Sequence, residues 1–242
     1  MWRSLVSGLI AVVCASGIAR AANIEVSTTR LAMSADSPIA AMNIRNASEQ
    51  QVALQAMVVR WSQKNGEDVF EPTRDILVNP PIFKLAPNAT QIARLGLQAK
   101  SIDSEQSYRL FLQEIPEANR AQQNLTTILR ISIPIFITGQ NSKPLLDSHL
   151  YVDPTGSAWI EFINRGNGHV QVTSISLSDG GGNGPVDIPT STYVLPGQTR
   201  RLALPDISLR KGQTVAIELS SDLEQALPPI QVQVSDGPTV LP

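Results

Sequence analysis

Cysteine is almost absent from the sequence, which limits how the fold can be stabilised. The one cysteine among the 242 residues is Cys14, and it lies in an N-terminal segment that we expect to be removed. Small secreted domains often depend on disulfides, so this chain must rely on its apolar core instead. With only His149 and His169 as histidines, a closed zinc site is excluded, and we expect neither a metal nor another cofactor.

The sequence also lacks a basic footprint and helical periodicity. The formal net charge is −2 and aromatic residues make up 5% of the chain, so nucleic acid is not an expected partner. No window between residues 22 and 242 sustains apolar residues at the i, i+3, i+4 spacing of a helix. Short alternating runs recur instead, separated by Gly, Pro, Asn, Asp and Ser. This pattern predicts an all-β protein.

The alternating runs fall into two groups on either side of a polar stretch, "GQNSKPLLD" at 139–147. Each group spans roughly 100 to 120 residues, the size of one immunoglobulin-like sandwich. We therefore expect two such β-sandwich domains in tandem, at 22–140 and 145–242. The glycine-rich "SDGGGNGP" at 178–185 lacks the Lys-Ser/Thr of a phosphate-binding loop and is interpreted as a hairpin loop. The predicted strands are 23–27, 39–46, 51–62, 90–97, 108–115, 125–138, 149–153, 158–164, 169–178, 199–205, 213–220 and 230–234.

Residues 1–21 have the pattern of a signal peptide. Arg3 precedes an apolar run at about 5–15, and Ala19-Arg20-Ala21 forms an A-x-A cleavage signal. The apolar run is too short to span a bilayer comfortably, so a retained membrane helix is disfavoured. We expect an exported protein whose formal net charge falls from −2 to −4 when Arg3 and Arg20 are removed.

A search for catalytic groups finds no convincing set. Asp147, Ser148 and His149 are adjacent, but neighbours on a strand point to opposite faces and do not form a triad. The carboxylates are scattered, and no pair stands out as an acid and base for glycoside hydrolysis. We therefore expect a binding protein rather than an enzyme. A secreted hydrolase with a scattered carboxylate pair is kept as an alternative.

The longest alternating run, "LTTILRISIPIFIT" at 125–138, is the main clue to binding. Every second residue from Leu125 to Ile137 is Leu or Ile except Thr127. Such an apolar row suits a central strand that faces its own core. It also suits a strand that is lent to another protein to complete an open sheet. Periodicity alone slightly favours the first interpretation.

Four segments carry a resemblance to a known family: "TTRL" (28–31), "ILVNPPIFKLAPNATQIARL" (76–95), "YRLFLQEIP" (108–116) and "RISIPIF" (130–136). In order and spacing they resemble the N-terminal domain of the PapD-like periplasmic pilus chaperones, and most of all the Csu-type, or archaic, chaperone–usher branch. The resemblance covers 23–138 and is weaker over 145–242. It implies two sandwiches arranged like a boomerang with a cleft between them.

The resemblance implies a function in the periplasm. Such chaperones bind pilus or spore-coat-U-like subunits, which lack a strand, and fill the groove by donor-strand complementation before delivery to an outer-membrane usher. Leu125, Thr127, Leu129 and Ile131 are then the residues that enter the groove, whereas Ile133, Ile135 and Ile137 serve the chaperone's own core. An apolar edge of this kind also allows the free protein to self-associate and cap it. A two-domain adhesion or structural module is the alternative, and it requires the whole apolar row to be buried internally.

The resemblance also implies an anchor for the subunit's terminal carboxylate. The family's arginine corresponds to Arg30 in "TTRL", but its lysine position is occupied by Ser132. Arg130, two residues earlier and on the same face of the strand, is our candidate replacement because a guanidinium binds a carboxylate bidentately. The alternative is an internal ion pair of Arg130 with a carboxylate such as Glu114. Asn79-Pro80-Pro81 is expected to form a tight turn, with a cis Asn79–Pro80 bond by resemblance.

Overall fold

The computed structural model describes residues 23–98, 104–116, 128–139, 141–178, 184–204, 207–223 and 226–237. Within these ranges every regular element is a β-strand and none is a helix, so the prediction of an all-β fold is confirmed. The predicted signal peptide at 1–21 lies outside the described residues, as does most of the loop predicted at 178–185.

The strands of the first half form two sheets that face each other. One sheet has the order β1 (Ile24–Val26), β3 (Ile39–Asn46), β8 (Thr90–Leu97), β6 (Ile76–Asn79). The other has the order β2 (Leu31–Met33), β10 (Arg130–Ile137), β9 (Gln106–Glu114), β4 (Val52–Lys64), β5 (Glu67–Pro72), and β7 (Ile82–Leu85) also pairs with β4. We refer to the second sheet as the β10 sheet.

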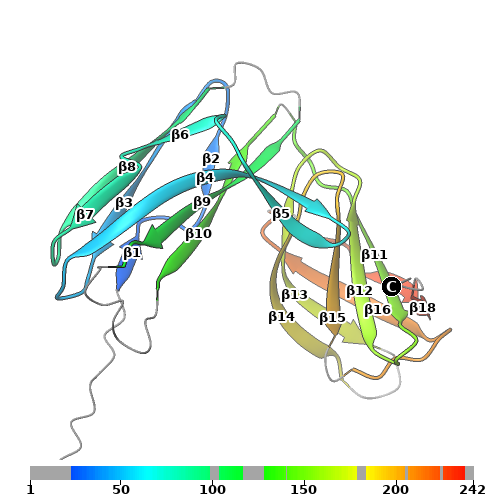
Figure 1. Ribbon diagram of the computed structural model, residues 1–242. Helices are drawn as coiled ribbons and strands as arrows, with labels where there is room; N and C mark the ends of the chain where they lie inside the picture. Colours follow the sequence, from blue (N-terminus) through cyan, green and yellow to red (C-terminus); the bar gives the residue numbers. More distant parts are fainter. Residues whose placement is uncertain are drawn as a thin grey trace, which may run out of the picture.

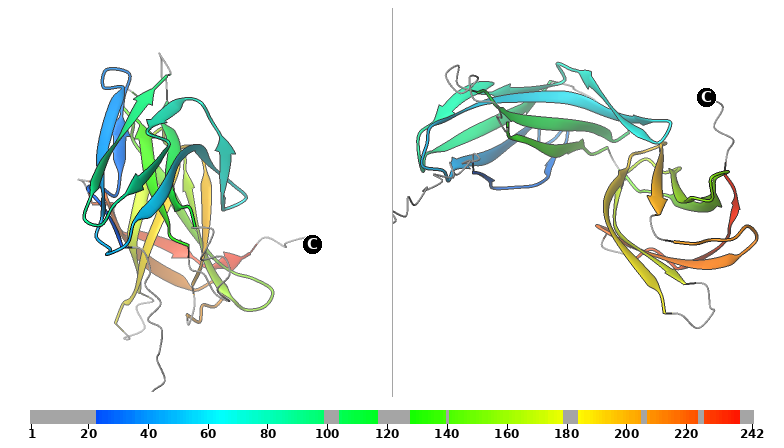
Figure 2. Two further views of the ribbon diagram at one scale, coloured as in Figure 1. Left: turned by 60° about the vertical axis from the view of Figure 1, so that its left-hand side comes forward. Right: turned by 60° about the horizontal axis from the view of Figure 1, so that its bottom comes forward.

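The strands of the second half form another two sheets. Their orders are β15 (Thr199–Leu204), β12 (Ala158–Asn164), β11 (Leu146–Val152), β18 (Ser235–Asp236), and β14 (Val186–Val194), β13 (Val170–Ser178), β16 (Thr214–Ser221), β17 (Ile230–Gln233). The two sandwiches meet end to end at an angle, and the β4–β5 hairpin, the start of β9 and the end of β10 lie toward the second one (Figure 1). The bend is also visible from the two further directions of Figure 2. This arrangement confirms two β-sandwich domains in tandem.

Alternation along β10 explains how the first core is built. Ile133, Ile135 and Ile137 have at most 1% of their surface exposed and belong to one apolar cluster with residues of β3, β4, β8 and β9. Each fully buried Ile contributes about 1.5–3 kcal/mol relative to an exposed one. The expectation that these three residues serve the protein's own core is therefore confirmed.

The structure also differs from the predicted strands. β10 begins at Arg130, so residues 128 and 129 precede the strand, while 125–127 lie outside the described residues. The predicted strands omit β5, although Asn65 and Gly66 both have positive φ (54° and 84°), as a two-residue hairpin turn requires. They also omit β14, an edge strand that tolerates Pro189 because its outer backbone needs no ladder partner.

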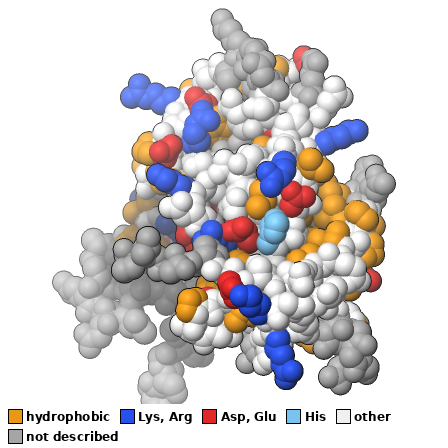
Figure 3. Space-filling model, turned by 90° about the vertical axis from the view of Figure 1, so that its right-hand side faces the viewer, with side chains coloured by type: hydrophobic (Ala, Val, Ile, Leu, Met, Phe, Trp, Pro, Cys, Tyr) orange, Lys and Arg blue, Asp and Glu red, His pale blue; other side chains and the backbone are white. Residues whose placement is uncertain are grey.

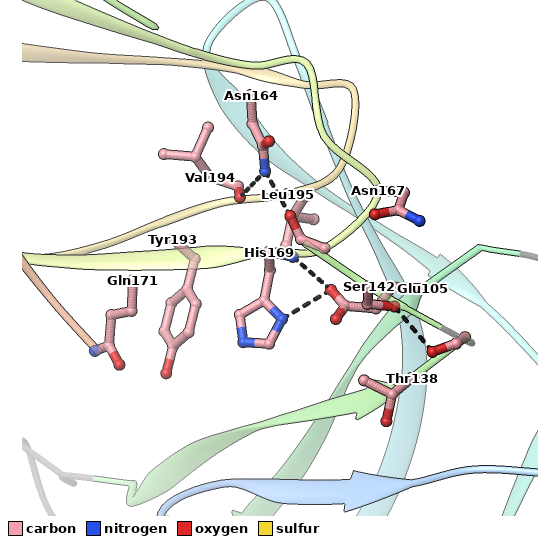
Figure 4. Close-up of polar contacts among 12 residues, drawn as sticks. Glu105, Thr138, Ser142, Asn164, Asn167, His169, Gln171, Tyr193, Val194 and Leu195 are labelled. Carbon is pink, nitrogen blue, oxygen red and sulfur yellow. Dashed lines mark hydrogen bonds and ion pairs between the residues drawn. The ribbon is translucent and has the colours of Figure 1, made fainter. Parts of the chain in front are cut away.

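The segment between the two sandwiches is fixed by a loop of the second one. The Leu145 amide donates to Asn164 Oδ1 (3.1 Å) and the Asn167 amide donates to the Lys143 carbonyl (3.0 Å). Figure 4 shows Asn164 bridging to the end of β14, where it donates to the Val194 carbonyl (3.1 Å). Nearer the other end of the chain, the turn at residues 79–81 contains a cis Asn79–Pro80 bond, as the resemblance implied.

Gly166 leaves no room for a side chain beneath this connecting segment. A Cβ on Gly166 would lie 2.3 Å from the Lys143 carbonyl oxygen and 2.5 Å from the Leu145 amide nitrogen. Because these are backbone atoms, Gly166→Ala must displace the segment, and we expect a loss of about 1–3 kcal/mol in the free energy of unfolding. Urea denaturation measures the loss. Gly184→Ala is the control, since a Cβ there meets nothing within 4 Å, and equal stability of the two variants would contradict the prediction.

Candidate functional site

More than half of the outer edge of β10 has no partner strand among the described residues. β9 pairs with β10 along its whole length, but on the other side β2 covers only Ile135, Phe136 and Ile137. The Glu114 amide donates to the Leu129 carbonyl (2.9 Å), so in an antiparallel ladder the backbone groups of Arg130 and Ser132 point away from β9. No described strand receives them. The described part of the chain therefore presents a short open edge.

The predicted donor residues lie at or before this edge. Leu129 and Ile131 are half-buried, and Ile131 packs against the first core. Ile128 is 47% exposed just before them. Leu125 and Thr127 lie outside the described residues. The row of alternate apolar residues is thus buried at Ile133–Ile137 and partly exposed at Leu129 and Ile131.

The face of the β10 sheet opposite its core carries the contact with the second sandwich; we name it the contact face. There Trp61, Phe136 and Leu195 form a buried cluster with Tyr193 at its margin. The Phe136 ring stacks on the His169 ring with a centroid distance of 3.4 Å and an angle of 5°. The Trp61 and Tyr193 rings meet edge to face at 5.5 Å. Aromatic packing therefore joins the two domains.

Polar contacts lie beside this aromatic cluster, and Figure 4 shows the one between Glu105 and His169. Glu105, whose side chain is 2% exposed, accepts from the His169 amide (2.9 Å) and lies 2.7 Å from His169 Nδ1. Gln63 Nε2 donates to the Tyr193 carbonyl (2.8 Å), and Gln63 Oε1 accepts from the Leu195 amide (3.1 Å). Both side chains satisfy backbone groups of the other domain, which fixes the relative position of the two.

Arg30 is already engaged across the domain contact. Its guanidinium donates to Asp222 Oδ2 (2.6 Å), Gln171 Oε1 (2.6 Å) and Tyr193 Oη (3.3 Å). Burial alone would lower the pKa of the Arg30 guanidinium, but the hydrogen bonds to Asp222 and Tyr193 outweigh burial and raise it. Arg30 is therefore a charged residue that links the domains as well as a candidate anchor.

Arg130 lies over an aromatic ring and does not pair with a described carboxylate. Its Cζ atom is 3.8 Å from the centroid of Phe111, and it makes no ion pair with any described residue. Glu114 Oε2 accepts from the Leu129 amide (3.3 Å), so the alternative ion pair of Arg130 with Glu114 is not observed. Ser132 is exposed on the same face. Both Arg130 and Ser132 are accessible to a ligand.

A third cation on the contact face, Arg109, was not among the site residues predicted from the sequence. Its Cζ lies 3.8 Å from the centroid of Trp61 and 5.5 Å from that of Tyr193. Its Nε is completely buried without a hydrogen-bond partner. Burial lowers the pKa of the guanidinium, partly offset by the charge of Asp68. The signal in the sequence was a charged residue inside the otherwise apolar "YRLFL".

Strand pairing separates these three cations into two groups. Leu31 pairs with Ile135, and Arg109 pairs with Pro134, so Arg30 and Arg109 lie on either side of Pro134. Arg130 pairs with Gln113 at the start of β10, four residues or about 13 Å before Pro134. The structure thus places Arg30 closer to Arg109 than to Arg130.

The residues considered for catalysis do not assemble. Asp147 pairs with Arg165 (2.6 Å), Ser148 is buried, and His149 is exposed. Among the described residues, no group of three or more His, Cys, Asp or Glu residues is arranged to hold a metal ion. The same residues include no helix that is long and apolar enough to cross a membrane. Figure 3 shows basic and acidic side chains interspersed on one face of the molecule.

Comparison with known families accounts for the first domain. Residues 23–142 match the family model of pili and flagellar-assembly chaperones, PapD N-terminal domain. The chain belongs to the PapD-like family of pilus chaperones. This match spans β1 to β10 and includes the half-paired edge. No curated protein sequence matches the chain at a significant level.

Solved chaperone structures share the fold of both domains. The Acinetobacter baumannii CsuC–CsuE chaperone–tip subunit complex of archaic Csu pili matches at 20% identity and a TM-score of 0.67, covering 88% of this chain and 100% of that one. The Salmonella enterica SafA pilin–SafB chaperone complex matches at 17% identity and a TM-score of 0.59, covering 88% of this chain and 97% of that one. The E. coli chaperone DraB matches at 16% identity and a TM-score of 0.59, covering 89% of this chain and 98% of that one.

The aromatic cluster predicts that the domains depend on Phe136. Phe136 is 1% exposed and touches both domains, and removal of a buried Phe side chain costs about 3–5 kcal/mol. We expect Phe136→Ala to lower the melting temperature and to separate the unfolding of the two domains into two calorimetric transitions. Phe70→Ala is the control, because Phe70 is 43% exposed. A single transition at the wild-type temperature in Phe136→Ala would contradict this role.

Proposed function

We propose that this protein is a periplasmic chaperone that binds pilus or spore-coat-U-like subunits by lending them β10 and the residues before it. The observation that carries the proposal is the unpaired edge of β10 beside Arg130 and Ser132. A subunit that lacks a strand needs the same things that this edge offers, which are free backbone donors and acceptors and an apolar row. Export by a cleaved signal peptide and delivery of the subunit to an outer-membrane usher belong to the same proposal.

The donor residues supply the energy of binding in this proposal. Leu125, Thr127, Leu129 and Ile131 alternate along the chain and insert into the subunit's groove. A fully buried Leu or Ile is worth about 1.5–3 kcal/mol, and part of this offsets the ordering of both partners. The half-buried state of Leu129 and Ile131 supports the proposal, because further burial is still available to them.

Co-expression with the subunit genes encoded beside it tests this function. We expect a one-to-one complex in the periplasm, and we expect Leu129→Ser to weaken it about 10- to 100-fold by removing one buried side chain. Leu77→Ser is the control, since Leu77 is 54% exposed on the other sheet. If no neighbouring subunit copurifies with the wild-type protein, a two-domain adhesion or structural module becomes the better explanation.

The anchor for the subunit's terminal carboxylate is proposed to include Arg30 and Arg130, with Ser132 at the family's lysine position. Arg130 has no carboxylate partner among the described residues, and its guanidinium donors remain available. Arg30 keeps a charge that its neighbours reinforce.

Arginine substitutions test the anchor separately from the strand. We expect Arg30→Ala and Arg130→Ala each to reduce the yield of copurified subunit, because each removes a charged donor from the carboxylate. Arg30→Ala should also lower the melting temperature of the free protein, since it breaks the contact with Asp222, whereas Arg130→Ala should leave it nearly unchanged. Wild-type subunit yields for both variants would refute the anchor.

A further inference from the structure

We propose that His169 is a pH-sensitive link between the two domains, and that its protonation strengthens their contact. The residues that carry this inference come from both domains. Glu105 and Arg30 belong to the first domain, and His169 and Asp222 belong to the second. The inference goes beyond the proposed function, because it concerns the free protein without any partner.

The contact between Glu105 and His169 determines where the imidazole carries its first proton. Glu105 Oε1 accepts from the His169 amide (2.9 Å) and lies 2.7 Å from His169 Nδ1, as Figure 4 shows. An ionised carboxylate can only accept hydrogen bonds, so a neutral His169 must carry its proton on Nδ1. Its other nitrogen, Nε2, then has a lone pair and no proton to donate.

Glu105 is a buried carboxylate that needs a cation. Its side chain is 2% exposed, and among the described residues His169 is the only basic side chain within ion-pair distance of it. A buried charge without a charged partner is costly. Protonation of His169 turns the hydrogen bond across the domain contact into an ion pair, which lowers that cost.

Asp222 provides a place for the second proton. His169 Nε2 lies 4.0 Å from Asp222 Oδ2, and the two side chains are 14% and 16% exposed, so solvent screens their interaction only in part. A neutral His169 cannot donate to this oxygen from Nε2, whereas a protonated one can. The protonated ring therefore lies between two carboxylates, one from each domain.

Other ionisable groups around the imidazole act in both directions. Arg30 donates to the same Asp222 oxygen (2.6 Å), and its charge opposes a further cation. The ring of Tyr193 lies 6.0 Å from that of His169, and Arg109 lies 5.5 Å from the Tyr193 ring, so the charge of Arg109 also opposes protonation. Only the carboxylates of Glu105 and Asp222 form ion pairs with the imidazole nitrogens among the described residues, and both favour it.

Phe136 holds the imidazole in place. The two rings are stacked with a centroid distance of 3.4 Å and an angle of 5°, and Phe136 is 1% exposed. The stacked ring has little freedom to turn away from either carboxylate, and the face of an aromatic ring also attracts a cation. The contact can therefore gain a charge without a rearrangement of its side chains.

The direction of the pH effect follows from linkage. A proton that strengthens the contact makes it stronger as pH falls and weaker as pH rises. Histidine changes its charge between about pH 5 and pH 8, so the stabilisation by His169 should be present at the acidic end of this range and lost at the alkaline end. Well below pH 5 the carboxylates themselves become protonated, and the stabilisation should decline again.

Melting temperatures of the free protein between pH 5.5 and pH 8 test this link. Gln at position 169 can still donate to Glu105 but does not titrate. We expect the advantage of the wild-type protein over His169→Gln to grow by about 2–4 °C between pH 8 and pH 5.5. His149→Gln is the control, since His149 is exposed, and its difference from the wild type should stay constant. A constant difference for His169→Gln would overturn the proposal.

A carboxylate variant shows which group takes up the proton. We expect Glu105→Gln to remove most of the pH dependence that His169→Gln removes, because the charge of Glu105 is what the protonated imidazole meets. Combining the two changes should remove little more than either alone. A pH dependence that survives in His169→Gln but disappears in Glu105→Gln would place the proton on Glu105 and overturn the assignment.

Nitrogen NMR of the imidazoles tests the link even if a variant at position 169 or 105 fails to fold. The histidines of the chain are His149 and His169, so His149→Gln leaves the signals of His169 alone. We expect a proton on Nδ1 only at pH 8, and protons on both nitrogens at pH 5.5. A proton on Nε2 only at pH 8, or a ring that is still neutral at pH 5.5, would contradict the proposal.

Discussion

The pairing of β2 with only three residues of β10 is the constraint on which the rest of this structure depends. If β2 ran further alongside β10, it would close this edge. The apolar row of β10 could then pack only in the protein's own core. Because β2 is so short, β10 is secured at one end, where Ile133, Ile135 and Ile137 are buried. The same strand is open at the other end. The end of β10 thus contributes to the stability of the fold, and its start remains available for pairing with another strand.

Besides its core side and its open edge, β10 has a face that contacts the second domain. Phe136 points to the face opposite the core and stacks on His169, while Arg30, beside the end of β10, reaches Asp222. A ligand that engages the open edge therefore acts on a strand whose other end is clamped between two domains. The fixed angle between the sandwiches follows from this clamp and from the loop that holds the connecting segment.

Much of the fold was predictable because alternation is a strong signal. β3, β8 and β12 have the predicted bounds, and the two-domain architecture followed from the polar stretch at 139–147. The edge strands β5 and β14, which each contain a proline, were missed. The strands β2, β6 and β7 were also missed, because three or four residues are too few to show alternation. The site was predicted less completely. Resemblance pointed to Arg30 and Arg130, but only the tertiary structure shows that Arg109 lies over Trp61 without an ion pair to any described residue, since periodicity does not indicate which cations find a carboxylate.

Pro134 has a consequence for any strand that is added to this edge. A second strand can form ladder hydrogen bonds with Arg130 and Ser132, but at Pro134 the ladder lacks a donor, and immediately beyond it β2 already occupies the edge. An added strand must therefore stop at a fixed level along β10. Pro134 and β2 therefore limit how far an added strand can pair along β10. This limit is set by the backbone and does not depend on the side chains of the added strand.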